Sequence, residues 1–169
     1  MLSKEKNVFL LNYSFDMEKV KKEARYSRIY KQIDGIMDSE NYPLSRMCTI
    51  AAVLHHKMDY FFWTGFYLLV DDELLVHSYQ GPVACMKLKK DSGVCWACLN
   101  KKESVIVDDV ESFPGHIACD SRSKSEIVIP LFNEKGCVYG VLDVDSNEKK
   151  SFDEVDALWL EKIVALINK

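Results

Sequence analysis

The sequence lacks any apolar run approaching the roughly 20 residues that a membrane-spanning helix needs. Its first residues, Met1 to Asp16, also lack the basic n-region, apolar h-region and small-residue cleavage site of a secretory signal peptide. The 22 basic residues are scattered along the chain and are outnumbered by 26 acidic residues, so the net charge is -4 and no basic stripe suits a nucleic acid. We therefore expect a cytoplasmic protein that binds neither a membrane nor a nucleic acid.

The sequence also lacks the ligands that would complete a zinc site. The segment Cys95-Trp96-Ala97-Cys98 is a C-x-x-C motif, but no second C-x-x-C and no H-x-x-x-H motif accompanies it. A thioredoxin-like dithiol calls for a βαβ context, which the surrounding sequence does not supply. A redox dithiol and two thiols on a buried helix face remain as alternatives for this motif. No metal and no cofactor are predicted.

Cysteine itself is not scarce. A chain of 169 residues, of which 48% are hydrophobic, can bury a sizeable core without disulfide bonds. In a reducing compartment, the cysteines of such a chain are more often buried, metal-binding or redox-active than paired in structural disulfides. Chemistry is therefore the first hypothesis for the six cysteines, at positions 48, 85, 95, 98, 119 and 137.

One cysteine lies in a polar loop that is badly suited to a buried core. The segment FPGHIACDSRSKSEIVIPL, residues 113–131, places Cys119 among serines and charged side chains. Nearby cations lower the pKa of a thiol, and the thiolate is the nucleophilic form. The loop therefore suits a reactive cysteine, although a solvated surface loop with an incidental cysteine is an equal alternative from these residues alone. The flanking residues that bear on this choice are His116, Asp120, Arg122, Lys124 and Glu126.

The periodicity of the chain predicts an α+β fold in which an antiparallel sheet lies between helices. Helices are expected over 17–36, ending near Gly35, over 43–57 with Cys48 on the core face, and over 94–100. Hairpins are expected over 60–79 and 127–144, and a further strand over 104–110. Ser151 and Glu154 form a capping box for a last helix. That helix is expected to bury Val155, Leu158, Trp159, Ile163 and Leu166.

The second hairpin allows an inference about carboxyl groups. If its turn is centred on residues 134–135, Glu126 faces Asp143, and Asp145 points the same way about 7 Å further along the strand. The same register pairs Val128 with Val141 and Phe132 with Cys137. Three carboxyl groups this close cannot all ionise cheaply, so at least one pKa should rise and supply a proton donor. Solvated strand ends are the alternative.

The motifs GPVAC (residues 81–85), GVC (93–95), FPGHIACDSRSKSEIV (113–128) and GVLDVDS (140–146) closely resemble those of the free methionine-(R)-sulfoxide reductases, which are GAF-fold domains. The resemblance implies an antiparallel sheet of about six strands flanked by helices, and free methionine (R)-sulfoxide as substrate. It places three redox cysteines at Cys85, Cys95 and Cys119. It places substrate-binding acids at Glu126, Asp143 and Asp145, with Trp63 packing near the substrate methyl group.

The chemistry expected of the residues agrees with this resemblance. Cys119 is predicted to attack the sulfoxide, with Glu126 and Asp143 as an acid pair, Cys85 as first choice for the resolving thiol and Cys95 as auxiliary. Trp96 and Cys98 depart from the family pattern and leave the resolving thiol open. Thioredoxin or a similar dithiol reductant is the expected partner, and a homodimer is left open.

The competing hypothesis is a GAF module that senses a small molecule and catalyses nothing. It accounts for the pocket and its acids, but not for three cysteines around that pocket. We expect one GAF-like catalytic domain over 1–169, with a helical part at 17–57, the sheet and active-site loops at 60–146 and a C-terminal helix at 152–168.

Overall fold

The computed structural model of the chain describes residues 2–39, 42–116 and 119–169, with side chains from Met17 onward. Its centre is a five-stranded antiparallel sheet in the order β2-β1-β5-β4-β3. The two hairpins expected from the sequence therefore pair with each other through β1 and β5. The strands are β1 (Trp63–Val70), β2 (Glu73–Gln80), β3 (Val105–Val107), β4 (Ser125–Phe132) and β5 (Val138–Ser146).

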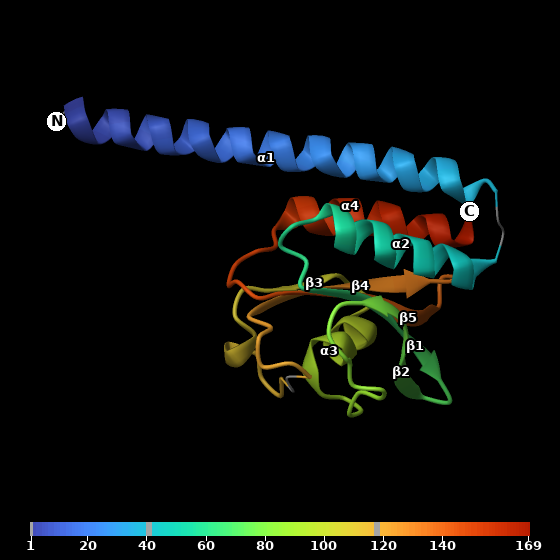
Figure 1. Ribbon diagram of the computed structural model, residues 1–169. Helices are drawn as coiled ribbons and strands as arrows, with labels where there is room; N and C mark the ends of the chain where they lie inside the picture. Colours follow the sequence, from blue (N-terminus) through green and yellow to red (C-terminus); the bar gives the residue numbers. More distant parts are fainter. Residues whose placement is uncertain (1, 40–41, 117–118) are drawn as a thin grey trace.

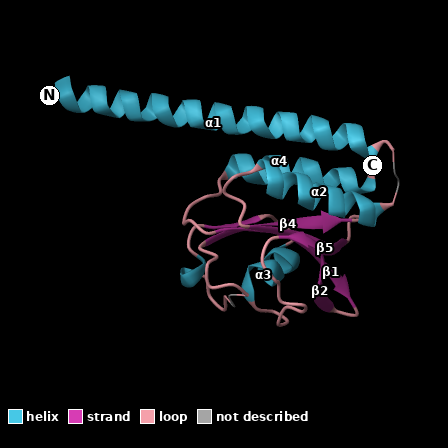
Figure 2. Ribbon diagram, viewed as in Figure 1, coloured by secondary structure: helices cyan, strands magenta, loops and turns pink. Residues whose placement is uncertain are grey.

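Helices cover both faces of this sheet. On one face α2 and α4 lie directly against the strands and α1 lies outside them, whereas α3 and the long loops cover the other face (Figures 1 and 2). The helices are α1 (Leu2–Met37), α2 (Pro43–Lys57), α3 (Gly93–Lys101) and α4 (Glu154–Ala165), and short 3-10 turns occupy Val110–Ser112 and Leu166–Asn168. This arrangement confirms the α+β prediction.

The sheet separates two apolar cores. The larger core joins α1, α2 and α4 to one sheet face, where Phe66, Ile127 and Leu142 are fully buried. The smaller core joins α3 to the other face and includes Trp63 and Tyr67. Alternation along each strand produces this division, because successive side chains of a strand point to opposite faces.

The sheet has five strands rather than about six, and β3 is shorter than expected. The outer edge of β2 meets the following segment at a single bridge between Leu75 and Lys87. The chain there leaves the loop that holds Cys85 and soon enters a turn, so no longer ladder forms in this described segment. Strand β3 ends at Val107 rather than at residue 110, because the side chain of Asp109 accepts a hydrogen bond from the backbone N–H of Glu111 and caps a 3-10 turn.

The register of the second hairpin differs from the prediction by two residues. Glu126 lies opposite Asp145, and Val128 lies opposite Asp143. Phe132 pairs with Val138 rather than with Cys137, next to a register shift at Leu131/Phe132. The side chain of Asn133 causes this, because its Oδ1 accepts hydrogen bonds from the backbone N–H groups of both Lys135 and Cys137 and closes a longer loop. A shift of two preserves the face, so the three acids still lie together.

Details of the helices also differ from the predictions. Cys48 is exposed, because the buried stripe of α2 runs through Met47, Ile50, Ala51 and Leu54. The capping box of α4 is formed by Asp153 and Asp156 rather than by Ser151 and Glu154. The α4 stripe shifts accordingly, so Leu158 is 49% exposed and Trp159 is partly buried between Tyr26 and Tyr30.

One buried carboxyl group fastens α1 to the rest of the fold. Asp156 on α4 is fully buried and accepts hydrogen bonds from Tyr26 of α1 at 2.7 Å and from Tyr60 at 2.6 Å. Lys22 of α1 forms a salt bridge with the same carboxylate. Because buried polar groups need partners, this network fixes how α1 sits on α4.

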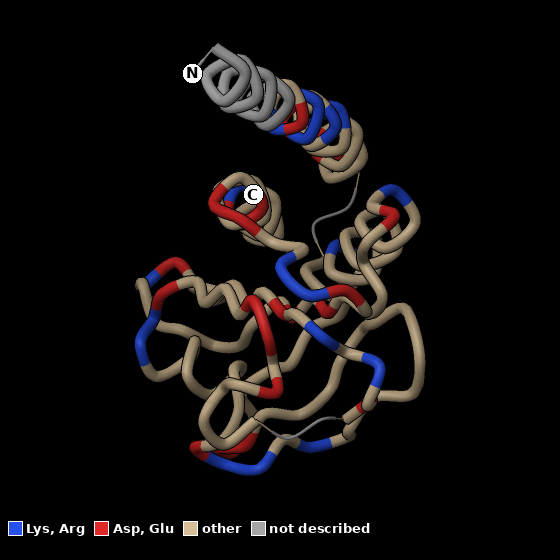
Figure 3. Tube along the Cα trace, turned by 90° about the vertical axis from the view of Figure 1, so that its left-hand side faces the viewer, with Lys and Arg blue, Asp and Glu red and all other residues tan. Residues whose placement is uncertain are grey.

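Basic and acidic positions alternate over the loops and helix ends (Figure 3). In the described part of the chain, none of the helices has the length and apolar character to cross a membrane.

Candidate active site

Two loops on the α3 side of the sheet are joined by a disulfide bond. Cys85 and Cys119 are paired, with their Cα atoms 5.6 Å apart. The loops roof a cavity whose floor is the sheet face that carries the acids. The polar or sulfur-bearing side chains that line it are Trp63, Tyr67, Cys95, His116, Cys119, Asp120, Ser123, Glu126, Asp143 and Asp145. The structure thus brings together all but one of the predicted site residues in one cavity lining, and the remaining one, Cys85, is bonded to Cys119.

The register of the sheet explains why these acids share one face. Trp63 of β1 lies opposite Asp145 of β5, and Gly65 lies opposite Asp143. On the other side of β5, Glu126 of β4 lies opposite Asp145. Side chains of directly opposed residues share a sheet face, so the acids and the Trp63 indole project into the cavity together.

Gly65 makes room for the aromatic wall of the cavity. A Cβ atom at this position would lie 2.5 Å from the Trp63 ring and 2.4 Å from Cβ of Tyr79, closer than atoms can pack. Trp63 stacks between Tyr67 and Tyr79, with ring centroids 5.8 and 5.4 Å away. The indole N–H donates to the carbonyl of Pro82, and the Tyr67 hydroxyl donates to the carbonyl of Cys85. The same two rings therefore wall the cavity and hold the Cys85 loop.

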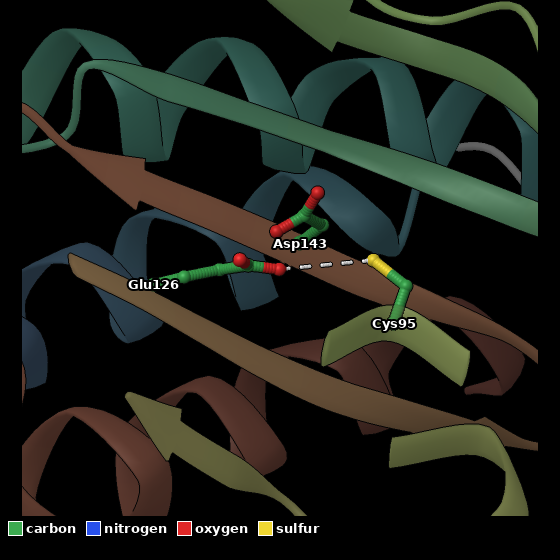
Figure 4. A group of neighbouring side chains, drawn as sticks. All are labelled: Cys95, Glu126 and Asp143. Carbon is green, nitrogen blue, oxygen red and sulfur yellow. Dashed lines mark hydrogen bonds between the residues drawn. The ribbon is translucent and has the colours of Figure 1, made fainter. Parts of the chain in front are cut away.

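Two of the three sheet acids are buried, and the third, Asp145, is partly buried. Glu126 and Asp143 are 5% and 7% exposed, and Figure 4 shows them beside Cys95. Burial raises the pKa of Glu126 well above its ordinary value, and the charges of Asp143 and Asp145 raise it further. Burial also raises the pKa of Asp143 to about 7 and that of Asp145 well above its usual range. At neutral pH such a cluster holds protons that exposed carboxyl groups would have lost.

Cys95 and Cys98 are buried free thiols on α3. The Sγ atom of Cys95 lies 4.0 Å from Oε1 of Glu126, whereas Cys98 points to the carbonyl of Val128 at 3.5 Å. Burial, reinforced by the charges of Asp143 and Glu126, raises the pKa of both thiols. In this disulfide form neither thiol is readily converted to the nucleophilic thiolate.

The cations of the Cys119 loop are already paired with acids. Arg122 donates from Nε and Nη2 to the Asp120 carboxylate, and its guanidinium lies 4.8 Å from the centre of the Phe62 ring. Lys124 is paired with Glu111 at 2.9 Å. The sequence expectation that these cations acidify Cys119 is therefore weakened, because their charges are balanced locally.

Two lining residues were not assigned a role from the sequence alone. Tyr67 of β1 is one of them, and its ring lies beside that of Trp63 in the cavity lining. His116 was noted only as a neighbour of Cys119. Its Nδ1 lies 4.0 Å from Oε2 of Glu126, and its Nε2 is buried with no hydrogen-bond partner among the described residues. Its place three residues before Cys119 was the available signal.

Comparison with known proteins places this site in a family. A GAF-domain profile matches residues 47–168. The chain is 43% identical to GAF domain-containing protein A of Dictyostelium discoideum, over 90% of this chain and 96% of that protein. It is 34% identical to the free methionine-R-sulfoxide reductase of Saccharomyces cerevisiae, over 94% and 91%. The crystal structure of free methionine-R-sulfoxide reductase from Neisseria meningitidis in complex with its substrate superimposes with a TM-score of 0.83 at 40% identity, over 87% of this chain and 88% of that one.

The chain belongs to the free methionine-R-sulfoxide reductases. Membership in this family, within the GAF domains, confirms the resemblance seen in the motifs. The four motifs on which the resemblance rests supply most of the cavity lining. Residues 81–85 and 93–95 belong to its roof and to α3, residues 113–128 run from the Cys119 loop into β4, and residues 140–146 lie on β5. The extra thiol of this reductase, Cys98, does not line the cavity.

The surroundings of the six thiols predict three rates of alkylation. Without reductant, iodoacetamide should modify the exposed Cys48 and Cys137 quickly and the buried Cys95 and Cys98 only after unfolding. Cys85 and Cys119 should react only after reduction. Peptide mapping by mass spectrometry distinguishes these classes. Rapid labelling of Cys95 in the oxidised folded protein, or of Cys119 before reduction, would contradict the arrangement described.

Proposed function

We propose that the protein reduces free methionine (R)-sulfoxide to methionine by thiol chemistry at the Cys119 cavity. The observation that carries the proposal is the joining of a cysteine pair and three buried acids in one cavity. A thiol that forms a disulfide supplies electrons, and a protonated carboxyl group supplies the proton that a departing oxygen needs. The family membership of the chain supports the same reaction.

In the proposed mechanism, the Cys119 thiolate attacks the electrophilic sulfur of the sulfoxide. One member of the Glu126–Asp143 pair donates its proton to the sulfoxide oxygen while the other holds the substrate. Methionine leaves, and Cys119 retains the oxygen as a sulfenic acid, so that one sulfoxide and one thiol give one thioether and one sulfenic acid. Burial favours this role, because it raises the pKa of both acids and keeps a proton available near neutral pH.

Cys85 then attacks the sulfenic acid, which releases water and forms the Cys85–Cys119 disulfide. The structure holds this disulfide, which supports Cys85 as the resolving thiol. Cys95 is an auxiliary thiol in this scheme, because its raised pKa makes it a poor competitor for the sulfenic acid. A dithiol reductant such as thioredoxin completes the cycle by exchange at the disulfide, of which Cys119 is the exposed partner.

The cavity suits a free amino acid rather than a residue within a chain. The α-ammonium group of methionine sulfoxide is a cation, and Asp143 and Asp145 offer carboxyl groups to it. The Trp63 ring offers an apolar wall for the substrate methyl group. A peptide bond would replace the ammonium group with a neutral amide, and the rest of the peptide chain would have to pass the roof formed by the two cysteine loops. Both effects favour the free substrate.

The alternative function is a non-catalytic GAF sensor for a small molecule. It uses the same cavity and acids, but it gives no role to the disulfide that joins the two roof loops. A reductase assay therefore separates the two functions.

The first prediction is that the protein consumes NADPH when it is coupled to thioredoxin and thioredoxin reductase with free methionine (R)-sulfoxide. N-acetylated and peptide-linked methionine sulfoxide are the matched substrates and should be reduced far more slowly, because they lack the ammonium group. A protein that turns over neither free epimer, while binding methionine, is a sensor. Comparable rates on the acetylated substrate would refute the proposed recognition of the ammonium group.

The second prediction separates the two cysteines of the disulfide. After full reduction and removal of the reductant, Cys119→Ser should release no methionine, whereas Cys85→Ser should release one equivalent and then stop. Cys137→Ser, which removes an exposed thiol remote in sequence from both loops, is the control and should cycle normally. A single-turnover burst from Cys119→Ser would mean that another thiol attacks. Disulfide mapping in Cys85→Ser then shows whether Cys95 substitutes for Cys85.

The third prediction concerns the acid pair: removing its carboxyl groups should slow catalysis but should stabilise the fold at high pH. Glu126→Gln and Asp143→Asn should each slow single-turnover methionine release by roughly 10²–10⁴-fold, the usual contribution of general acid catalysis. The wild-type rate should fall as pH rises through the ionisation of the donor. The double variant should lose little more than either single variant, because the two groups act as one unit.

The same substitutions should stabilise the fold at high pH. A carboxyl group with a raised pKa in the folded protein stabilises it fully below the ordinary acid pKa, and this stabilisation is lost as pH rises through the folded-state value of about 7 for Asp143. Asp143→Asn should therefore raise the melting temperature more at pH 8 than at pH 5. Asp71→Asn, at an exposed turn position with φ of 48°, is the control and should change neither readout. If both acid variants released methionine at the wild-type rate in the single-turnover assay, the acids would bind the substrate and would not catalyse its reduction.

A further inference from the structure

Among the described residues that line the cavity, His116 carries the basic side chain. The other titratable groups of that lining include the carboxyl groups of Asp120, Glu126, Asp143 and Asp145. Its ring is only 14% exposed and stands in the loop three residues before Cys119. The backbone N–H of His116 donates to the carbonyl of Phe113, and Ser92 donates its hydroxyl hydrogen to the carbonyl of Gly115. The ring is therefore held at the cavity by a turn that is tied to the start of α3.

The two nitrogens of the ring have different surroundings. Nδ1 faces Oε2 of Glu126 at 4.0 Å, whereas Nε2 is buried and meets no hydrogen-bond partner in the part of the chain that the structure describes. An unpartnered buried nitrogen is costly, so such an atom calls for an explanation. Here the structure holds the disulfide form, in which the Cys119 sulfur is bonded to Cys85 and has no proton to offer. Reduction of the disulfide frees a thiol in the same cavity lining.

Among the described side chains of the Cys119 loop, no cation with an uncompensated charge is left to lower the pKa of that thiol. Arg122 and Lys124 are paired with Asp120 and Glu111, so their charges are compensated. Asp120, next to Cys119 in the sequence, is the partner of Arg122, so this ion pair brings no net charge to the thiol. A nucleophilic Cys119 therefore needs a base, and the cavity offers one.

We propose that His116 is the general base that deprotonates Cys119 and that Glu126 orients its ring. The proposal rests on the proposed function, in which Cys119 attacks the sulfoxide. It assigns the three residues the roles of nucleophile, base and orienting acid, an arrangement that activates thiols and hydroxyls in unrelated enzymes.

The protons balance over the step. In the free reduced enzyme Nδ1–H donates toward Oε2 of Glu126, and the lone pair on Nε2 takes the proton of the Cys119 thiol. The thiolate attacks the sulfur of the sulfoxide, and Glu126 gives its own proton to the departing oxygen. Glu126 is then a carboxylate, and it takes the Nδ1 proton from the imidazolium. The ring ends neutral, Glu126 is protonated again, and the thiol proton has in effect been moved to the acid.

The charges around the ring suit this exchange. Burial lowers the pKa of His116, so the resting ring is neutral and able to accept a proton. The groups facing the cavity from other elements are Glu126 on β4, Asp143 and Asp145 on β5, Cys95 on α3 and Asp120 on the same loop. Any of these acids that is ionised stabilises the imidazolium once it forms.

The experiment measures the reactivity of Cys119 without any sulfoxide. In a Cys85→Ser background, where this disulfide cannot form, iodoacetamide alkylation of Cys119 is followed against pH by peptide mapping. The exposed Cys137 in the same molecule is the internal reference. We expect Cys119 to be alkylated with a midpoint below the value of about 8.5 for a free thiol. His116→Gln should raise that midpoint and slow the Cys119 reaction at pH 7 by about tenfold or more relative to Cys137, since one pKa unit is a tenfold change in thiolate.

Two further variants separate a base from a merely structural residue. Imidazole added to His116→Ala should restore much of the lost rate, which a purely structural ring would not allow. His56→Gln, which removes an exposed histidine, should leave the ratio unchanged. A parent midpoint near 8.5, an unchanged ratio in His116→Gln or a failure of imidazole to rescue would each overturn the proposal. Because alkylation consumes no substrate, this result and that of the reductase assay can fail independently.

Discussion

The desolvation of three carboxyl groups on one face of the sheet is the constraint on which the rest of the site depends. Glu126, Asp143 and Asp145 come from two adjacent strands, and under the roof formed by α3 and the two cysteine loops the first two are buried and Asp145 is partly buried. An isolated ionised carboxylate in such a place is too costly, so the cluster holds protons or binds a cation. Proton donation and recognition of an ammonium group are the two consequences, and both need the roof in place.

The roof is therefore as important as the acids, and its parts are held by the cavity wall. Trp63 and Tyr67 each donate one hydrogen bond to a carbonyl of the Cys85 loop, while their rings face the cavity. Gly65 leaves the space that the Trp63 ring fills. Opposite them, Arg122 lies over Phe62 and keeps the Cys119 loop near the start of β1. None of these interactions involves the disulfide, so the loops have anchors other than the bond that the reaction breaks.

Much of this could be predicted because it depends on strand periodicity, which is robust to small errors. A register error of two residues named Asp143 instead of Asp145 as the partner of Glu126 and still placed all three acids on one face. The errors of detail came from local turn and cap chemistry, such as the hydrogen bonds of Asn133 that lengthen the hairpin loop. Contacts between segments distant in the chain could not be predicted at all. Arg46 is buried because it donates to the carbonyls of Met37 and Lys169, and no local pattern announces that. In the same way, the charges of Arg122 and Lys124 suggested an acidic thiol until their partners were known.

Cys119 is either bonded to Cys85 or present as a free thiol. The redox state of the disulfide therefore decides which groups meet in the cavity. Bonded to Cys85, its sulfur joins the two loops that roof the cavity, and Nε2 of His116 is left without a partner among the described residues. Released from Cys85, the thiol can meet that nitrogen and complete the set of nucleophile, base and acid. Oxidation thus removes the nucleophile and also the partner that satisfies the base. The hydrogen bond that reduction allows between thiol and imidazole favours the reduced state, because a buried donor or acceptor is stabilised when it is paired. An enzyme that must be reset by an external dithiol after every turnover benefits from this bias.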